Sequence, residues 1–124
     1  MTVQKITLVI GASENPERYS NKAIQLLNQY NHPVLALGLR NGMVGPTTIV
    51  KDIDAFKSLP IDTVTLYINP QLQATHYTAI MDLKPKRVIF NPGTENLAFE
   101  SLLNENGILT EEACTLVLLK TGQY

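Results

Sequence analysis

The chain has 124 residues, of which 44% are hydrophobic and 17% charged, and this length predicts one domain whose core needs no metal or disulfide. Its formal net charge of −1 excludes the broad basic surface that nucleic-acid and anionic-membrane binding require. A single cysteine, Cys114, excludes an intrachain disulfide and a cysteine-based zinc site, and no apolar run reaches the roughly 20 residues of a membrane span, so a cytoplasmic location is expected.

The first segments alternate between strand and helix patterns. Residues 5–11, KITLVIG, are β-branched and apolar, which is typical of a strand buried on both faces. A helix is predicted over residues 19–31, with Ser20 or Asn21 as its N-cap. Residues 32–38, HPVLALG, predict a second buried strand.

The middle of the chain continues the alternation. Residues 39–49 contain two glycines and a proline, so we expect a loop there. A short helix is predicted over 50–60 and a third strand over 61–69. A helix over 70–84 follows, with Pro70 in its first turn.

The last segments repeat the pattern. Residues 86–93 predict a fourth strand, and residues 94–106 predict a helix capped by Thr94. A short fifth strand is expected within residues 107–113. Residues 114–122 fit either a final short helix or an extended tail, and periodicity does not decide between them.

This alternation predicts the fold class. Strands linked by helices form a parallel sheet with helices on both faces, so we expect a doubly wound, Rossmann-like α/β domain of about five strands in three layers. Ligands of such sheets bind beyond the carboxyl ends of the strands. The candidate site residues therefore lie in segments 11–20, 38–41, 68–71 and 91–94.

The loop after the first strand, GASENPERYS, has features of a phosphate site. Gly11 tolerates unusual backbone angles, and the next helix offers free amide hydrogens and a positive dipole end. The dinucleotide fingerprint has two further glycines, which this loop lacks. Ser13, Asn15 and Ser20 add polar donors, and Arg18 adds a planar cation. The alternative is a strand-to-helix turn without a ligand.

The other strand ends carry weaker signals. Arg40 stands near the position where NAD-binding domains place an acid, and an arginine there favours a ribose phosphate, as in NADP or coenzyme A. A solvated loop arginine is the alternative. The third and fourth strands end in INP (68–70) and NPG (91–93), where Asn-Pro pairs favour turns and Gly93 permits close approach of a ligand. For both segments, the alternative is an ordinary loop that contacts no ligand.

Few residues are candidates for catalysis. His32 opens the second strand at the opposite end of the sheet, and for His76 a packing role is expected over that of a general base. Glu111 and Glu112 precede Cys114 and disfavour a reactive thiolate. The sequence has no P-loop, Ser-His-Asp arrangement or metal-ligand cluster, so it favours a binding module over an enzyme.

Four segments together, GASENPERYSNKA, PIDTVTLYINP, NPGTEN and GILTEEACTLVLL, resemble the family of small stand-alone coenzyme A-binding proteins. Members of that family are similar to the N-terminal domain of the succinyl-CoA synthetase alpha subunit. The resemblance covers nearly the whole chain and implies a Rossmann-like fold that binds coenzyme A, while it implies no reaction. Many members carry V-N-P at the end of the second strand, where this chain has LGLR.

The resemblance also implies where the ligand lies. The first loop would follow the phosphates, Arg40 and its neighbours would lie near the adenosine, and the later loops would line the rest of the groove. The implied coenzyme-binding residues are Gly11, Ala12, Ser13, Asn15, Arg18, Tyr19, Ser20, Gly38, Leu39, Arg40, Ile68, Asn69, Pro70, Asn91, Pro92 and Gly93. Coenzyme A or an acyl-CoA is the expected ligand, and a homodimer or a partner enzyme is a further possibility.

Two other functions stay open from the sequence. An NADP-linked oxidoreductase would also use Arg40, although 124 residues leave little room for a second substrate site. An interaction module that has lost its ligand would not depend on Ser13 or Arg18. Binding of NADPH, or full function without those two side chains, would distinguish these alternatives.

Overall fold

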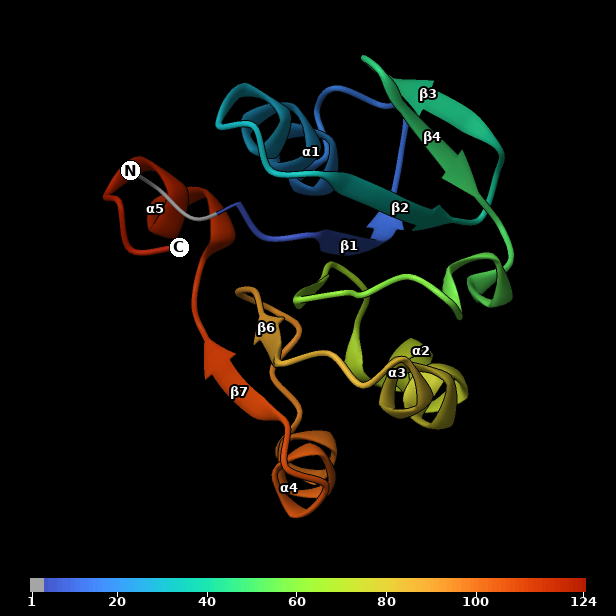
Figure 1. The fold of residues 1–124 in the computed structure, drawn as a ribbon, viewed down its shortest axis with the longest axis vertical. Coiled ribbons are helices and arrows are strands. Elements are labelled where there is room, and N and C mark those ends of the chain that lie inside the picture. Colours follow the sequence, from blue (N-terminus) through green and yellow to red (C-terminus); the bar gives the residue numbers. More distant parts are fainter. Residues whose placement is uncertain (1–3) are drawn as a thin grey trace.

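The computed structural model describes residues 4–124, which form a three-layer α/β structure (Figure 1). Within these residues, seven strands form one sheet in the order β3-β4-β2-β1-β5-β6-β7. The strands are β1 (Thr7–Ala12), β2 (Val34–Gly38), β3 (Gly42–Val44), β4 (Thr47–Val50), β5 (Thr63–Leu66), β6 (Arg87–Phe90) and β7 (Leu109–Glu112). The α-helices are α1 (Tyr19–Gln29), α2 (Pro70–Gln73), α3 (Tyr77–Leu83), α4 (Leu97–Glu105) and α5 (Thr115–Lys120).

Helices cover both faces of the sheet because the central strands are apolar on both sides. On one face, Val9 of β1 packs with Ile24 of α1 and Leu119 of α5. On the other face, Leu8 belongs to a larger cluster that includes side chains of α3 and α4, among them Phe99. The predicted Rossmann-like α/β fold is therefore confirmed.

The sheet is larger than the predicted five strands because residues 39–49 are not a loop. Instead, β3 and β4 form an antiparallel hairpin at one edge, and β4 pairs in parallel with β2. Gly45, with φ +54°, and Pro46 make the tight turn of this hairpin. The buried side chains of Val44 and Thr47 face the protein, which fixes the hairpin against the sheet.

Two of the predicted helices are shorter than expected. Residues 50–60 contain only a 3₁₀ turn, η1 (Ile53–Phe56), which the Asp52 carboxylate caps by accepting from Asp54 N at 2.9 Å. The helix expected over 70–84 is interrupted by a 3₁₀ turn, η2 (Ala74–His76). His76 has φ −110° there, outside the range of a continuous α-helix, so α3 starts anew.

The predicted helix caps were wrong. Arg18 is the N-cap of α1 and its side chain makes no capping bond, while Ser20 and Asn21 lie inside the helix and are buried. Asn96 caps α4 by accepting from Phe99 N at 3.1 Å, whereas the Thr94 hydroxyl donates to the Asn91 carbonyl. Residues 114–122 contain the short helix α5, which decides between the two alternatives left open.

Within residues 4–124, no helix is both long and apolar enough to cross a membrane.

Candidate functional site

The order of the strands creates a switch point between β1 and β5. The strand β2 and the hairpin β3–β4 lie on one side of β1 in the sheet, whereas β5, β6 and β7 lie on its other side. Loops that leave β1 and β5 therefore run apart onto opposite faces, and this is where doubly wound sheets bind ligands. Gly11, Ala12 and Ile68 lie at this point.

Gly11 is tightly constrained at the switch point. Its φ of +98° is rarely adopted by side-chain-bearing residues, and it coincides with a register irregularity between β1 and β2. A β-carbon at Gly11 would lie 3.0 Å from the carbonyl carbon and oxygen of Tyr67 and 3.0 Å from Ile68 Cγ2. The backbones of β1 and β5 thus approach so closely that this position requires glycine.

The end of β2 joins the same cluster. A β-carbon at Gly38 would lie 2.5 Å from the Ala12 carbonyl oxygen and 2.9 Å from Ile49 Cγ2. Gly38 therefore lets β2 pack directly against the loop that leaves β1. The structure brings together the predicted residues Gly11, Ala12, Gly38 and Ile68.

The loop from Ser13 to Arg18 is held by its own side chains. Ser13 Oγ accepts from Asn15 N at 3.1 Å, and Asn15 Oδ1 accepts from Glu17 N at 3.0 Å. Asn21 Nδ2 donates to the Ser13 carbonyl at 2.9 Å and ties the loop to α1. These bonds give the loop a defined shape, and in them the side chains of Ser13 and Asn15 act as acceptors.

The start of α1 leaves positive groups available. Among residues 4–124 no side chain caps its first amide hydrogens, so the positive end of the helix dipole faces the loop. Arg18 and Arg40 are exposed, and neither forms an ion pair with another described residue. Lys22 adds a third cation, with its Nζ 5.4 Å from the Tyr19 ring centroid.

The loops after β5 and β6 are joined by Gln73, a residue that the sequence analysis did not identify. Gln73 is fully buried, and its Nε2 donates to the carbonyl oxygens of Ile68 at 3.0 Å and Thr94 at 2.7 Å. Its Oε1 accepts from Asn96 Nδ2 at 3.0 Å. No local pattern reveals this role, because the partners lie on separate segments of the chain.

The two Asn-Pro pairs have different surroundings. Asn69 is exposed, and its Oδ1 accepts from Leu72 N at 2.9 Å, which caps α2 with Pro70 at its start. Asn91 is buried, and its Nδ2 donates to Thr65 Oγ1 and to the Leu66 carbonyl, while its Oδ1 accepts from Thr115 N. The Asn91 side chain therefore fixes β5, β6 and α5 in place and leaves no amide hydrogen for a ligand.

The remaining predicted residues lie at the rim of this end of the sheet. Gly93 has φ +91° and no atom near a β-carbon position, and its amide donates to Glu95 Oε1 at 2.9 Å. Pro92 is exposed beside it. Tyr19 and Leu39 are 68% and 93% exposed, which leaves two large apolar side chains uncovered next to the cationic loop.

Of the two histidines, His32 lies at the other end of the sheet, whereas His76 lies in η2, directly after α2. His32 is buried at the amino ends of the strands, where burial, with Lys5 and Arg87 nearby, lowers its pKa. His76 is half-buried, and burial lowers its pKa too. Residues 4–124 contain no group of three His, Cys, Asp or Glu residues placed to hold a metal ion.

Comparison with known proteins shows the family of this chain. Residues 5–120 match the family described as the CoA binding domain. The chain belongs to the CoA binding domain family. The resemblance seen in the sequence is thereby confirmed, and the matched segment includes every loop at the switch point.

Solved structures resemble this CoA binding domain over nearly its whole length. One uncharacterized protein is 43% identical with a TM-score of 0.92, and the match covers 99% of this chain and 100% of that one. A Thermus thermophilus protein is 22% identical with a TM-score of 0.86, covering 98% and 91%. A hypothetical protein from Pyrococcus horikoshii OT3 is 23% identical with a TM-score of 0.81, covering 95% and 82%. The search of curated proteins found no match.

Proposed function

We propose that this protein binds coenzyme A or an acyl-CoA along the carboxyl ends of β1, β2, β5 and β6. The observation that carries the proposal is the Gly11 turn at the switch point, where φ is +98°, within a chain of the CoA binding domain family. Gly11 lets the chain leave β1 directly beside Tyr67 and Ile68, and the start of the helix that follows this loop is a site that favours phosphate. The loops that follow β2, β5 and β6 would contact the rest of the coenzyme.

The diphosphate would lie between Gly11 and the start of α1. The uncapped amide hydrogens of the first helical turn favour an anion, and a phosphate supplies the acceptors they lack. Arg18 is exposed at the N-cap and has no carboxylate partner among the described residues, so its guanidinium is free to form a bidentate contact.

The adenosine end would lie beside the end of β2. Arg40 follows β2 directly and would contact the 3′-phosphate of the ribose, which distinguishes coenzyme A from its dephospho form. Leu39 is almost wholly exposed and offers an apolar surface to the adenine ring. Tyr19, at the first position of α1, offers a second apolar surface to the adenine ring.

We further propose that the protein binds the coenzyme without catalysing a reaction itself. The support is the placement of the titratable groups, since His32 lies at the other end of the sheet and His76 is partly buried in the η2–α3 segment. The half-buried Cys114 precedes the short helix α5, and Glu111 is engaged by Arg87 at 3.1 Å. A protein of this kind would hold, deliver or sense the coenzyme.

Isothermal titration with four ligands tests this function. Coenzyme A and acetyl-CoA should bind, dephospho-CoA should bind more weakly, and NADPH should not bind. Arg18→Ala should weaken coenzyme A binding about 10- to 100-fold, the size of a lost charged hydrogen bond. Arg40→Ala should weaken coenzyme A binding and leave dephospho-CoA binding unchanged.

Lys86→Ala is the matched control, because Lys86 is an exposed cation at the amino ends of the strands. Its affinity for coenzyme A should equal that of the unmodified protein. Absence of heat with both coenzyme A and acetyl-CoA would overturn the proposal. Equal losses in the Arg18, Arg40 and Lys86 variants would instead show that net charge, and not this site, attracts the ligand.

A further inference from the structure

The charges at the carboxyl end of the sheet differ between its two halves. The half where β1 and β2 end carries the exposed cations Arg18, Lys22 and Arg40, beside two glutamates of the loop after β1. The half where β5, β6 and β7 end is formed by segments without lysine or arginine, since residues 58–83 and 88–119 contain neither. Positive charge that attracts the phosphates of a ligand therefore belongs to the first half.

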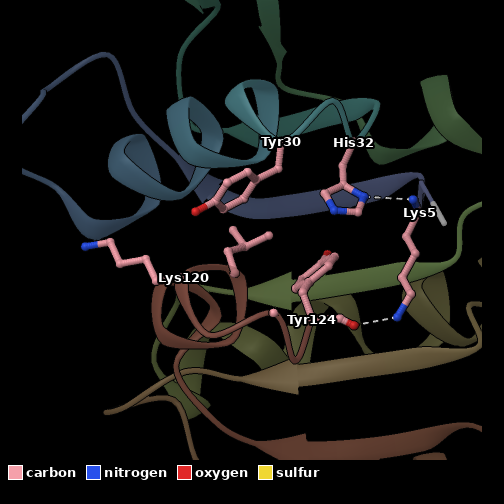
Figure 2. Close-up of a pocket in the computed structure, with 7 residues that line it drawn as sticks. Lys5, Tyr30, His32, Lys120 and Tyr124 are labelled. Atoms are coloured by element: carbon pink, nitrogen blue, oxygen red, sulfur yellow. Dashed lines mark hydrogen bonds between the residues drawn. The ribbon is translucent and has the colours of Figure 1, made fainter. Parts of the chain in front are cut away.

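The cations that flank these two segments belong to the opposite end of the sheet. Lys57 precedes the start of β5, and residues 84–87, which contain three cations, join α3 to the start of β6. Lys120 ends α5 and lines the hollow in Figure 2 together with Lys5 and His32, which precede β1 and β2. The nearest cations along the chain are thus placed at the amino ends of the strands.

Three carboxylates stand at the carboxyl ends of β6 and β7. Glu112 is the last residue of β7, and it pairs in register with Phe90, the last residue of β6. Glu95 lies in the loop that follows β6, and its Oε1 accepts from the Gly93 amide at 2.9 Å. Glu100 lies in the first turn of α4, and its Oε2 is buried with no hydrogen-bond partner among the described residues.

These three carboxylates are close enough to act on one another. Burial raises the pKa of Glu100, and the hydrogen bond and charge of Glu112 and the charge of Glu95 raise it further. Leu97, which stands between Glu95 and Glu100 in the sequence, is 78% exposed. A group that enters this half of the site would therefore meet negative charge and an apolar side chain.

The length of the coenzyme matches the distance between the two halves. In the proposed function the diphosphate lies beside β1, and β7 is three places away in the sheet, about 14 Å at the spacing of neighbouring strands. The pantetheine arm has roughly twelve bonds from its phosphate ester oxygen to its sulfur, like the backbone of about four residues, and spans about 14 Å when extended. Because the adenosine lies on the β2 side, the arm would run the other way and place the sulfur near the ends of β6 and β7.

We propose that the site accepts acyl-CoA esters whose acyl group is uncharged and discriminates against esters whose acyl group ends in a carboxylate, such as succinyl-CoA. This inference rests on the proposed function, because it requires the phosphates of the coenzyme to lie beside β1. A terminal carboxylate would then come close to Glu95 and Glu112, which repel it, and the segments around them supply no cation to pair with it. An uncharged acyl group meets no such repulsion.

Isothermal titration with butyryl-CoA and succinyl-CoA tests this inference, since the two acyl groups differ by a methyl group in place of a carboxylate. Succinyl-CoA should bind about 10-fold more weakly than butyryl-CoA at low salt, and the difference should shrink as salt is added. Arg18→Ala should weaken the binding of both esters by the same factor, because it acts on the diphosphate that they share.

One variant with a matched control locates the repulsion. Glu95→Gln removes the charge and keeps an oxygen that can accept from the Gly93 amide, so it should reduce the ratio of the two affinities about 3-fold. Glu105→Gln removes an exposed acid at the far end of α4 and should leave the ratio unchanged. Equal affinities for the two esters, or equal effects of the two variants on the ratio, would overturn this inference while coenzyme binding stands. Absence of binding by coenzyme A and by both esters would overturn the proposed function, and this inference with it.

Discussion

Glu14 and Gly42 are in direct contact across the carboxyl end of the sheet, although they lie on different loops. The Glu14 carboxylate accepts from the Met43 amide at 2.9 Å, and a β-carbon at Gly42 would lie 2.7 Å from Glu14 Cγ and Oε2. This contact fastens the loop after β1 to the hairpin β3–β4. It therefore links the loop that carries Arg18 to the hairpin that follows Arg40, the two cations proposed to hold the coenzyme.

Gly42→Ala should lower the free energy of unfolding by about 0.5–1.5 kcal/mol, because the new methyl group displaces the Glu14 carboxylate from its hydrogen bond. The backbone of Gly42 tolerates alanine, since its φ is not positive. In the Glu14→Ala background the same substitution should cost much less. Urea denaturation of the two single variants and the double variant measures this coupling, and strictly additive losses would contradict it.

Gly11→Ala should lower the stability by about 1–3 kcal/mol and should abolish coenzyme A binding, because the site combines a φ of +98° with carbonyl atoms 3.0 Å away. Gly93→Ala is the matched control, with φ +91° and open space around it. In Gly93→Ala the loss of stability comes from the positive φ alone, because no atom lies close to the new methyl group. Denaturation midpoints that are equal for the two variants would show that the contact with Tyr67 has no energetic effect.

Gln73→Ala should lower the stability by about 2–4 kcal/mol, because it leaves the carbonyl oxygens of Ile68 and Thr94 without their donor in the interior. The neighbouring Gln71 is exposed, so Gln71→Ala should change the stability by less than about 0.5 kcal/mol. Thermal denaturation of both variants checks the difference. The affinity for coenzyme A should fall in Gln73→Ala but not in Gln71→Ala, since the loops after β5 and β6 separate when Gln73 is removed.

Glu100 should make the protein more stable in mild acid than at neutral pH. Burial, followed by the hydrogen bond and charge of Glu112, raises the pKa of Glu100 above its ordinary value of 4.5. The folded state then binds a proton more readily than the unfolded chain, so this contribution to stability falls as pH rises from 4.5 through the folded pKa. Glu100→Gln should therefore raise the Tm at pH 7 and have little effect at pH 4, whereas Glu105→Gln, an exposed control on the same helix, should alter neither.

The alternation of strands and helices was predictable because it depends on local patterns. The predicted strands over residues 5–11, 32–38, 61–69, 86–93 and 107–113 overlap β1, β2, β5, β6 and β7. Once the order of elements is known, right-handed crossovers place the loop after β1 at the ligand-binding end. The hairpin β3–β4 was missed because its short strands are half exposed, and only pairing with β2 makes them part of the sheet.

The sequence by itself determined the fold class, which follows from residue periodicity, and the family, which was identified from the resemblance of four segments to known members. It also predicted a turn at Gly11, because a glycine stands there at a strand end. Only the tertiary structure decided which side chains join the loops, because those bonds cross long separations: Glu14 reaches Met43 across 29 positions, and Gln73 reaches Thr94 across 21. It also decided that Asn91 points inward and that Lys5, His32 and Tyr124 meet at the far end. Such contacts depend on how strands stack in space, which no local pattern encodes.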